Sequence, residues 1–259
     1  MTDKLWYKTW FSSPDYLELY KHRDSKDAKR IISLFFKHIR LKRYSNILDL
    51  ACGGGRHSIL FAKKGFNVTG IDLSKYLINQ AKQKLKGEFS KYKDLLHFEI
   101  KDMRDIQHIS EFDLVVNLFT SFGYFTKHTD NEKVINAVSK ALKQGGYFLF
   151  DFLNSDYLKK HLVPFDTKKF DGKTAIQVRT IKRDIVTKEI YILYKRLPKH
   201  YYPGITHFTE SIKLYNFLQI NDMFKKYGLL TIKKFGDYDG SVFKEKNSKR
   251  LIVIARKTE

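Results

Sequence analysis

A glycine-rich turn between two apolar segments constrains the fold of this chain more than any other feature. Residues 47–50 run into the three glycines at 53–55, and a second apolar segment, residues 68–71, ends at Asp72. Glycine adopts backbone conformations with φ > 0 and lets a ligand lie against the backbone. An acidic residue about twenty residues after such a turn is typical of a strand–helix–strand unit that binds a nucleoside. The pattern therefore predicts an α/β fold that holds an adenosine-containing cofactor.

The glycine turn departs from the pattern of a dinucleotide-binding loop. That pattern, G-x-G-x-x-G, needs a third glycine for close packing of the helix under a pyrophosphate. Here Gly53 and Gly55 are followed by Arg56, His57 and Ser58, so a serine stands where the third glycine belongs. A nicotinamide dinucleotide is therefore disfavoured as the cofactor.

The same stretch resembles motif I of the class I S-adenosylmethionine-dependent methyltransferases. In that motif an acidic residue stands two positions before a small-x-Gly-x-Gly loop, which corresponds here to Asp49 followed by Ala51, Gly53 and Gly55. Ala51 replaces the usual first glycine, which is a mild departure. The resemblance implies that S-adenosylmethionine is the cofactor.

Four further segments match that family in the order in which the family uses them. Asp72 corresponds to the acid that binds the ribose, and Asp102 to the acid that accepts from the adenine amino group, with Met103 packing on the ring. Residues 112–119 correspond to the fourth strand and residues 142–151 to the fifth. Five matches in order are far more specific than any one of them.

The resemblance implies a Rossmann-like α/β fold, in which a seven-stranded, mostly parallel sheet carries helices on both faces. It also implies a set of cofactor-binding residues, namely Asp49, Ala51, Gly53, Gly55, Arg56, Asp72, Leu73, Asp102, Met103, Asn117 and Phe119. Asp49 has a second interpretation, because a carboxylate at its position can cap the loop by accepting from N–H groups. No metal site is expected.

Two additions to this core are predicted. Residues 1–45 have apolar positions at helical spacing and are expected to form an N-terminal helical cap. Residues 46–154 and 216–259 are assigned to the core. Residues 155–215 are expected to form an antiparallel β insert, which in this family commonly makes a wall of the acceptor site. Period-two patterning predicts three strands in it, over residues 173–182, 189–197 and 205–215, with turns at 184–188 and around Pro203.

The composition is that of a protein with one large core. The chain has 259 residues, of which 42% are hydrophobic, and this length can bury an α/β core with an elaboration. Its first residues lack the apolar stretch of a secretory leader, and no later segment approaches about eighteen consecutive apolar residues. We therefore expect a cytoplasmic enzyme, either a monomer or a homodimer. The single cysteine, Cys52, excludes an intrachain disulfide and is expected to be a packing residue.

The formal net charge of +21 has two interpretations. A basic excess of this size can attract a chain to phosphates, such as those of RNA, nucleotide-linked sugars or a membrane surface. The lysines are, however, spread over nearly every segment together with many Ile, Asn, Tyr and Phe residues, as an AT-rich genome would encode them. The sequence has no zinc cluster and no arginine-rich tail. Nucleic acid is therefore not the favoured partner, and no membrane interaction is expected.

Missing motifs narrow the class of acceptor. Residues 117–120 stand where methyltransferases of amide or base nitrogens carry an Asn-Pro-Pro-Tyr signature, and the sequence has no Pro-Cys nucleophile for pyrimidine carbon chemistry. Residues 119–124 instead resemble a segment of small-molecule methyltransferases, including those of nucleotide-linked amino sugars. The resemblance implies methyl transfer to nitrogen or oxygen of a small molecule by in-line displacement. The alternatives are an RNA methyltransferase and a non-catalytic adenosine-binding partner subunit.

Candidate acceptor-site residues come from the cap, the core and the insert. Tyr16, Tyr20 and Arg23 belong to the cap, where helical spacing places the two tyrosines on one face. Tyr124 follows the fourth strand, and His207 lies in the insert. The two cap tyrosines could instead serve to pack the cap against the core. His22 of the cap is a further candidate. The candidates for a general base lie in the insert and are His200, His207 and Glu210.

Overall fold

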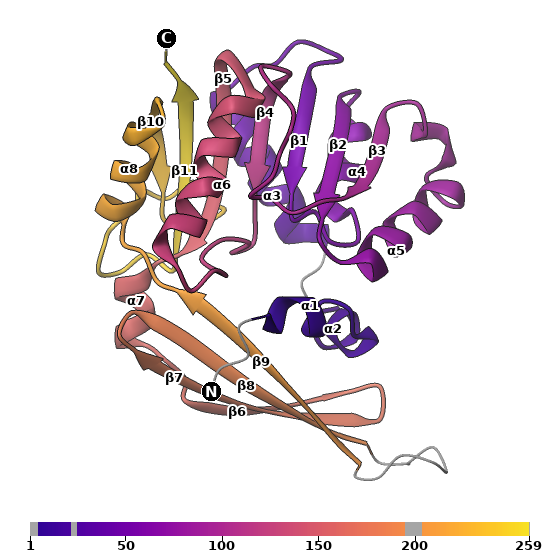
Figure 1. Cartoon of the computed structure of the whole chain (residues 1–259), viewed down its shortest axis with the longest axis vertical. Coiled ribbons are helices and arrows are strands. Elements are labelled where there is room, and N and C mark those ends of the chain that lie inside the picture. Colours follow the sequence, from indigo (N-terminus) through magenta and orange to yellow (C-terminus); the bar gives the residue numbers. More distant parts are fainter. Residues whose placement is uncertain (1–4, 22–24, 195–203, 259) are drawn as a thin grey trace.

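A seven-stranded sheet forms the centre of the molecule (Figure 1). The computed structural model describes residues 5–21, 25–194 and 204–258. The strands of this sheet are β1 (Asn46–Leu50), β2 (Asn67–Asp72), β3 (Leu96–Ile100), β4 (Phe112–Asn117), β5 (Leu142–Leu153), β10 (Leu229–Phe235) and β11 (Arg250–Lys257). Their order is β10-β11-β5-β4-β1-β2-β3, in which β1 to β5 are parallel and β11 runs antiparallel to both neighbours. The predicted mostly parallel sheet is confirmed.

Helices cover both faces of this sheet. One face carries α3 (Ser25–His38), α4 (Arg56–Ala62) and α5 (Lys75–Lys86), the other carries α6 (His128–Ala141) and α8 (Phe217–Lys226), and a 3-10 turn, η1 (Ser90–Tyr92), precedes β3. Side chains alternate between the faces along a strand. Leu114 and Val116 of β4 therefore pack with the first group of helices, whereas Val115 packs with the second.

In the described part of the chain, no helix is both long and apolar enough to cross a membrane.

The N-terminal segment divides between the cap and the core. The short helices α1 (Trp6–Trp10) and α2 (Pro14–Leu19) lie at the carboxyl edge of the main sheet (Figure 1). The longer α3 instead packs beside α4, with Ile31 and Phe35 fully buried in the apolar layer between these helices and the sheet. The predicted cap over residues 1–45 is therefore corrected: α3 belongs to the core, because the apolar face of this helix packs against α4 and the main sheet.

A second, antiparallel sheet follows β5 and the short helix α7 (Ser155–Lys160). Its strands are, in chain order and in space, β6 (Phe165–Phe170), β7 (Lys173–Lys182), β8 (Ile185–Tyr194) and β9 (Ile205–Lys213). The sequence pattern predicts three of these strands and omits β6, because Asp166, Lys168 and Lys169 interrupt its apolar alternation. Charged side chains of this kind are typical of an edge strand, which is the position of β6.

The turn between β7 and β8 is shorter than predicted. Arg183 and Asp184 alone form it, with φ of +46° and +59°, and Lys182 pairs with Ile185 across the hairpin. Two consecutive residues with positive φ are typical of the type I′ turn, whose twist matches that of the flanking strands. The expected turn at residues 184–188 is therefore wrong, and Lys188 belongs to a strand. The other expected turn, around Pro203, lies outside the described residues.

The small sheet faces the carboxyl edge of the main sheet, with α1 and α2 between the two (Figure 1). The ring centroid of Trp10 in α1 lies 4.6 Å from that of Phe208 in β9. Lys173 of β7 donates to Oδ1 of Asp15 in α2 over 2.8 Å. The cap is therefore held in place by the small sheet as well as by the core.

Gly55, at the start of α4, is expected to tolerate no side chain. Its φ is +77°, and a Cβ atom here would lie 2.6 Å from Cζ of buried Phe98. We expect Gly55→Ala to lower the free energy of unfolding by about 2–5 kcal/mol, because backbone strain and overpacking add. Gly172→Ala is the matched control, since Gly172 has φ of +69° but a Cβ there would meet no atom within 4 Å. The control should cost only about 1–2 kcal/mol in denaturant unfolding, and equal losses would contradict the packing argument.

Candidate active site

Two cavities meet at the carboxyl edge of the main sheet. The smaller cavity, of about 350 Å³, lies over the ends of β1, β2 and β3 and is covered by α1. The larger cavity, of about 540 Å³, extends from the glycine turn past the loop after β4 to α7, β8 and β9. Residues that line both cavities are Phe11, Tyr16, Ala51, Gly53, Ser121 and Tyr124. The two spaces therefore adjoin at these residues.

Asp72 fixes the glycine turn from the end of β2. Its Oδ2 accepts from the backbone N–H of Gly53 (2.9 Å), and its Oδ1 accepts from that of Ser74 (2.8 Å), just before α5. Burial raises the pKa of Asp72, and the two backbone hydrogen bonds oppose that shift. A carboxylate has about four acceptor positions. Asp72 therefore retains acceptor capacity toward the smaller cavity, which it lines.

Asp49 connects β1 to α4. Its Oδ2 accepts from Oγ of Ser58 over 2.6 Å, and the side chain is buried. Burial raises the pKa of Asp49 to about 7, although the hydrogen bonds from Ser58 partly offset this effect. Asp49 lines only the larger cavity, so its carboxylate lies apart from the smaller one.

Asp102 and Met103 follow β3 and line the smaller cavity. Arg104 donates to both carboxylate oxygens of Asp102, from Nε to Oδ1 (3.0 Å) and from Nη2 to Oδ2 (2.6 Å). Burial raises the pKa of Asp102, but the hydrogen bonds from Arg104 outweigh burial and hold this pKa below its usual value. Asp102 is therefore ionised at neutral pH beside the buried side chain of Met103.

The loop after β4 is held in an unusual backbone conformation. Phe119 and Thr120 have φ of +58° and +65°, a region that non-glycine residues rarely adopt. Oδ2 of the buried Asp151 accepts from the N–H of Phe119 (2.9 Å), and its Oδ1 accepts from Nη2 of Arg250 (2.6 Å). The same Arg250 nitrogen donates to Oγ1 of Thr120 (3.0 Å). An ion pair between buried Asp151 of β5 and half-buried Arg250 of β11 therefore determines the shape of a wall of the larger cavity.

The predicted cofactor residues divide between the cavities. The smaller cavity is lined by Ala51, Gly53, Asp72, Leu73, Asp102 and Met103, and the larger by Asp49, Ala51, Gly53, Arg56 and Phe119. Gly55 and Asn117 line neither cavity, and their direct contact with a cofactor stays a prediction. Gly55 packs under the turn against Phe98, and the amide of buried Asn117 donates to the carbonyl of Ser121 (3.0 Å). Both residues support the walls from beneath.

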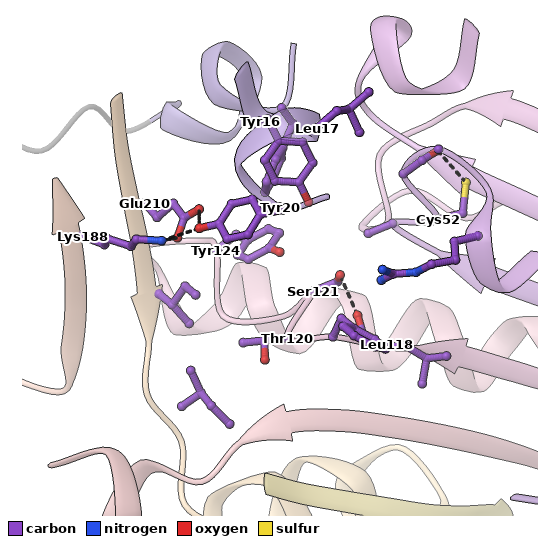
Figure 2. Close-up of a pocket in the computed structure, with 18 of the residues that line it drawn as sticks. Tyr16, Leu17, Tyr20, Cys52, Leu118, Thr120, Ser121, Tyr124, Lys188 and Glu210 are labelled. Atoms are coloured by element: carbon purple, nitrogen blue, oxygen red, sulfur yellow. Dashed lines mark hydrogen bonds and ion pairs between the residues drawn. The ribbon is translucent and has the colours of Figure 1, made fainter. Parts of the chain in front are cut away.

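The three predicted acceptor-site tyrosines, Tyr16, Tyr20 and Tyr124, lie together in the lining of the larger cavity (Figure 2). The rings of Tyr16 and Tyr20 meet edge to face with centroids 5.2 Å apart. Tyr124 is half-buried, and burial of its hydroxyl raises the pKa of this group well above the usual value. Tyr16 and Tyr124 line both cavities, whereas Tyr20 lines only the larger one.

Glu210 of β9 is the centre of a polar cluster that joins the cap to the small sheet. Its Oε1 accepts from the hydroxyl of Tyr20 (2.6 Å) and from Nε1 of Trp10 (2.7 Å). Nζ of Lys188 in β8 lies 3.5 Å from Oε2 of Glu210 and also donates to the Tyr20 hydroxyl (Figure 2). Lys188 was not predicted, because the sequence pattern placed it in a turn. The Lys188, Tyr20 and Glu210 side chains all line the larger cavity.

His207 lies on the opposite face of β9, which corrects its predicted place in the acceptor site. Its Nε2 lies 2.6 Å from Oε2 of Glu189, and its ring stacks on Tyr191 at 4.6 Å. Successive residues of a strand point to opposite faces. Glu210, three positions later, therefore reaches the cavity that His207 cannot reach. The other candidates Arg23, His22 and His200 lie outside the described residues.

His57, the second residue of α4, is a cavity residue that sequence reasoning missed. It lines the larger cavity, and its ring centroid lies 4.9 Å from that of Phe119. Within the described residues, Nε2 of this buried imidazole has no hydrogen-bond partner. Burial, and then the charge of Arg56, lower the pKa of His57 to about 3. The only sequence signal is a histidine two residues after the glycine turn.

His57 is expected to make the protein less stable in acid. The folded protein keeps this imidazole neutral down to about pH 3, whereas the unfolded chain binds a proton below pH 6.5. Stability is therefore lost as the pH falls below 6.5, by up to about 1.4 kcal/mol per pH unit. In His57→Phe this loss should be absent, so the difference in free energy of unfolding between wild type and variant should change between pH 7 and pH 4.5. A constant difference in denaturant titrations would contradict a buried neutral histidine.

The chain is similar in sequence to methyltransferases. Residues 47–146 match a protein family described as methyltransferase domain. YqeM of Bacillus subtilis (strain 168), which is named as a methyltransferase, is 40% identical over 116 residues, or 44% of this chain and 45% of that protein. The dTDP-3-amino-3,4,6-trideoxy-alpha-D-glucopyranose N,N-dimethyltransferase of Streptomyces venezuelae is 25% identical over 174 residues, or 66% of this chain and 68% of that protein. The chain spans about half the length of the first curated relatives that it matches.

A solved structure has the same fold over nearly the whole chain. It is the crystal structure of an S-adenosylmethionine-dependent methyltransferase from Clostridium acetobutylicum ATCC 824, and it superposes with a TM-score of 0.77. The alignment covers 95% of this chain and 97% of that chain at 23% sequence identity. The shared architecture therefore includes the surroundings of both cavities.

Proposed function

We propose that residues 47–146, which match a methyltransferase domain, belong to the class I S-adenosylmethionine-dependent family, and that this protein transfers a methyl group from S-adenosylmethionine to nitrogen or oxygen of a small-molecule acceptor. The observation that carries the proposal is the junction of two cavities at Tyr16, Ser121 and Tyr124. The smaller cavity has the residues of an adenosyl site, and the larger leaves space for a second molecule beside it. Transfer between two ligands requires such a junction.

The residues that line the smaller cavity offer the hydrogen-bond acceptors and the apolar surface that an adenosyl group needs. Asp72 offers carboxylate oxygens at the end of β2, where a ribose would bring two hydroxyl groups. Asp102 offers an acceptor for the adenine amino group, and buried Met103 offers an apolar surface for the ring. A Cβ atom at Gly53 would lie 3.9 Å from Cδ1 of Leu77, so the turn leaves its cavity side open for a ligand. These residues would hold the cofactor.

Methyl transfer requires mainly that the protein orients the acceptor atom toward the methyl group. When bound, the cofactor supplies a methyl group on a sulfonium, which is already electrophilic. The protein then has to hold the acceptor atom in line with this methyl group, an effect that is worth about 7–11 kcal/mol in well-oriented systems. We assign this task to Tyr16, Tyr20 and Tyr124, which lie side by side in the lining of the larger cavity (Figure 2). The helices α1 and α2 exclude water from the junction.

The larger cavity favours a small molecule over a polynucleotide. It lies between the core, α2 and the strands β8 and β9, and the cluster of Glu210, Tyr20 and Lys188 joins α2 to these strands. The Streptomyces venezuelae relative is named for methylation of an amino group on a nucleotide-linked sugar. That name supports a nitrogen acceptor on a small molecule. The cytoplasmic location and the monomeric or homodimeric state stay predictions.

Loss of the Asp72 carboxylate is expected to weaken cofactor binding. Asp72→Ala removes the acceptor for the ribose hydroxyls, and the affinity for S-adenosylhomocysteine should fall by about 1.5–3 kcal/mol. Calorimetry of the folded variant measures this change. Asp94→Ala is the control, because Asp94 is exposed and lines neither cavity. Unchanged affinity in Asp72→Ala would exclude the assigned adenosyl site.

Methyl transfer itself is tested with S-adenosylmethionine that carries a labelled methyl group. We expect label to enter the small-molecule fraction of a metabolite extract and not total RNA, because the larger cavity is bounded by the core, α2 and the strands β8 and β9. Asp72→Ala should label this fraction more slowly, and Asp94→Ala at the wild-type rate. Label in RNA would favour the RNA methyltransferase. Cofactor binding without label in either fraction would favour a non-catalytic partner subunit.

A further inference from the structure

The small sheet has an outer face, which points away from the cap and the cavities. Its inner face carries Lys173, Tyr194 and Glu210, which contact the cap. Paired residues of neighbouring antiparallel strands lie on the same side of a sheet, and successive residues alternate between the sides. The strand register therefore places four rows of side chains on the outer face. From β6 to β9 these rows are Lys169-Thr174-Leu193-Ile205, Thr167-Ile176-Tyr191-His207, Phe165-Val178-Glu189-Thr209 and, without β6, Thr180-Thr187-Ser211.

The outer face is more apolar than a sheet face that contacts water. Antiparallel sheets with one solvated face alternate apolar residues on the inside with polar residues on the outside. The four outer rows nevertheless contain the apolar or aromatic residues Phe165, Ile176, Val178, Tyr191, Leu193 and Ile205. Of these, Phe165, Ile205 and Tyr191 are 57%, 49% and 37% exposed. A cluster of exposed apolar side chains marks a surface that binds another molecule.

The outer face also lacks the basic excess of the whole chain, which has a net charge of +21. Besides His207, the only charged residues in the four rows are Lys169, at a corner, and Glu189, near the centre. Oε2 of Glu189 accepts from Oγ1 of Thr209 (2.8 Å) and lies 2.6 Å from Nε2 of His207, so its charge has partners within the chain. Basic residues return only in a fifth row at the hairpin end, Lys182-Ile185-Lys213. A charge-poor centre with a charged rim is typical of a protein–protein interface.

We infer that the outer face of the small sheet is a homodimer interface, on which the same face of a second copy packs. Two copies of a chain with a net charge of +21 repel each other, and they approach best through a face on which the charges cancel. A two-fold axis brings the same face of each copy together, so a neutral, apolar face is complementary to itself. An acidic partner would instead require several basic residues on this face, whose four rows hold one lysine.

The outer face is large enough for a specific interface. Strands lie about 4.8 Å apart and residues on one side recur about every 6.7 Å along a strand, so the four rows cover a flat area of about 500 Å². Two copies together therefore bury about 1,000 Å², and side chains that interdigitate add to this area. That size reaches the lower limit of specific protein–protein interfaces, which is about 1,000 Å². Two sheets packed in this way form a sandwich with a shared apolar layer.

A second copy on the outer face lies directly behind a wall of the larger cavity. Lys188 and Glu210, which line that cavity, are the sequence neighbours of Glu189 and Thr209 on the outer face. The dimer interface and the cavity wall are therefore the two sides of the same strands, β8 and β9. The inference goes beyond the proposed function and does not depend on methyl transfer.

The test is the mass of the protein in solution, measured by sedimentation equilibrium over a range of concentrations at about 0.15 M salt. We expect wild type to have twice the mass of one chain. Tyr191→Lys and Ile205→Lys should each raise the dissociation constant of the dimer at least about tenfold, because each buries an unpaired charge in an apolar interface. The matched controls are Ile232→Lys and Leu230→Lys in β10, whose wild-type residues are 37% and 50% exposed at an edge of the main sheet. Both controls should dimerise as wild type does.

A second measurement needs no substitution. The side chain of His207 is 49% exposed in one chain, and that of His97, in β3 at an edge of the main sheet, is 69% exposed. Diethyl pyrocarbonate modifies accessible imidazoles, and mass spectrometry of peptides measures the rate at each histidine. We expect His207 to react several-fold more slowly at concentrations where the dimer forms than after dilution. His97 should react at the same rate in both.

Two results would overturn the inference. The first is a wild-type protein that stays monomeric at every concentration, with His207 equally reactive throughout, which would leave the outer face to a different protein. The second is a dimer that the β10 controls weaken as much as the outer-face variants do, because the two copies would then meet elsewhere. Should a lysine variant fail to fold, the concentration dependence of His207 in wild type decides the question by itself.

Discussion

The buried carboxylate of Asp72 is the interaction on which both cavities depend. It accepts from the N–H groups of Gly53 and Ser74, and so joins the turn after β1, the end of β2 and the start of α5. A buried carboxylate is costly unless such donors satisfy it. Because Gly53 lines both cavities, the same hydrogen bonds that stabilise the ionised carboxylate also set where the two spaces meet. Asp151 has the equivalent role on the other side of β4, where it determines the shape of the loop at Phe119.

The core of the fold could be predicted because its signals are local. The apolar residues of β1 and β2, the glycines between them and the acid at the end of β2 lie within one continuous stretch of sequence. Parallel strands align their carboxyl ends at one edge, so residues that follow β1, β2 and β3 come together without any further information. This is why Ala51, Gly53, Asp72, Asp102 and Met103 line one cavity as expected.

The acceptor side could be predicted only in part, because it depends on strand phase and on distant contacts. Both faces of β9 carry mixed polar and apolar residues, so its pattern indicates a strand but does not tell which face is buried. His207 and Glu210 were therefore equivalent in sequence, and only Glu210 reaches the cavity. Its partner Trp10 lies 200 residues away in the sequence. Lys188 faces the cavity because the two-residue turn starts β8 at Ile185 and so determines which residues of this strand point to each face. The sequence contains no local signal for either contact.

The placement of the aromatic residues in α1 gives the protein an intrinsic optical probe. The chain has two tryptophans, Trp6 and Trp10, and both are buried in this one helix of five residues. The indole N–H of Trp10 donates to the same Glu210 oxygen that binds Tyr20, and Trp6 meets Tyr124 edge to face at 5.1 Å. Tryptophan emission therefore comes from the cap alone, with one indole against the small sheet and the other against the junction of the cavities. Any ligand that moves α1 changes the fluorescence of the unlabelled, unmodified protein.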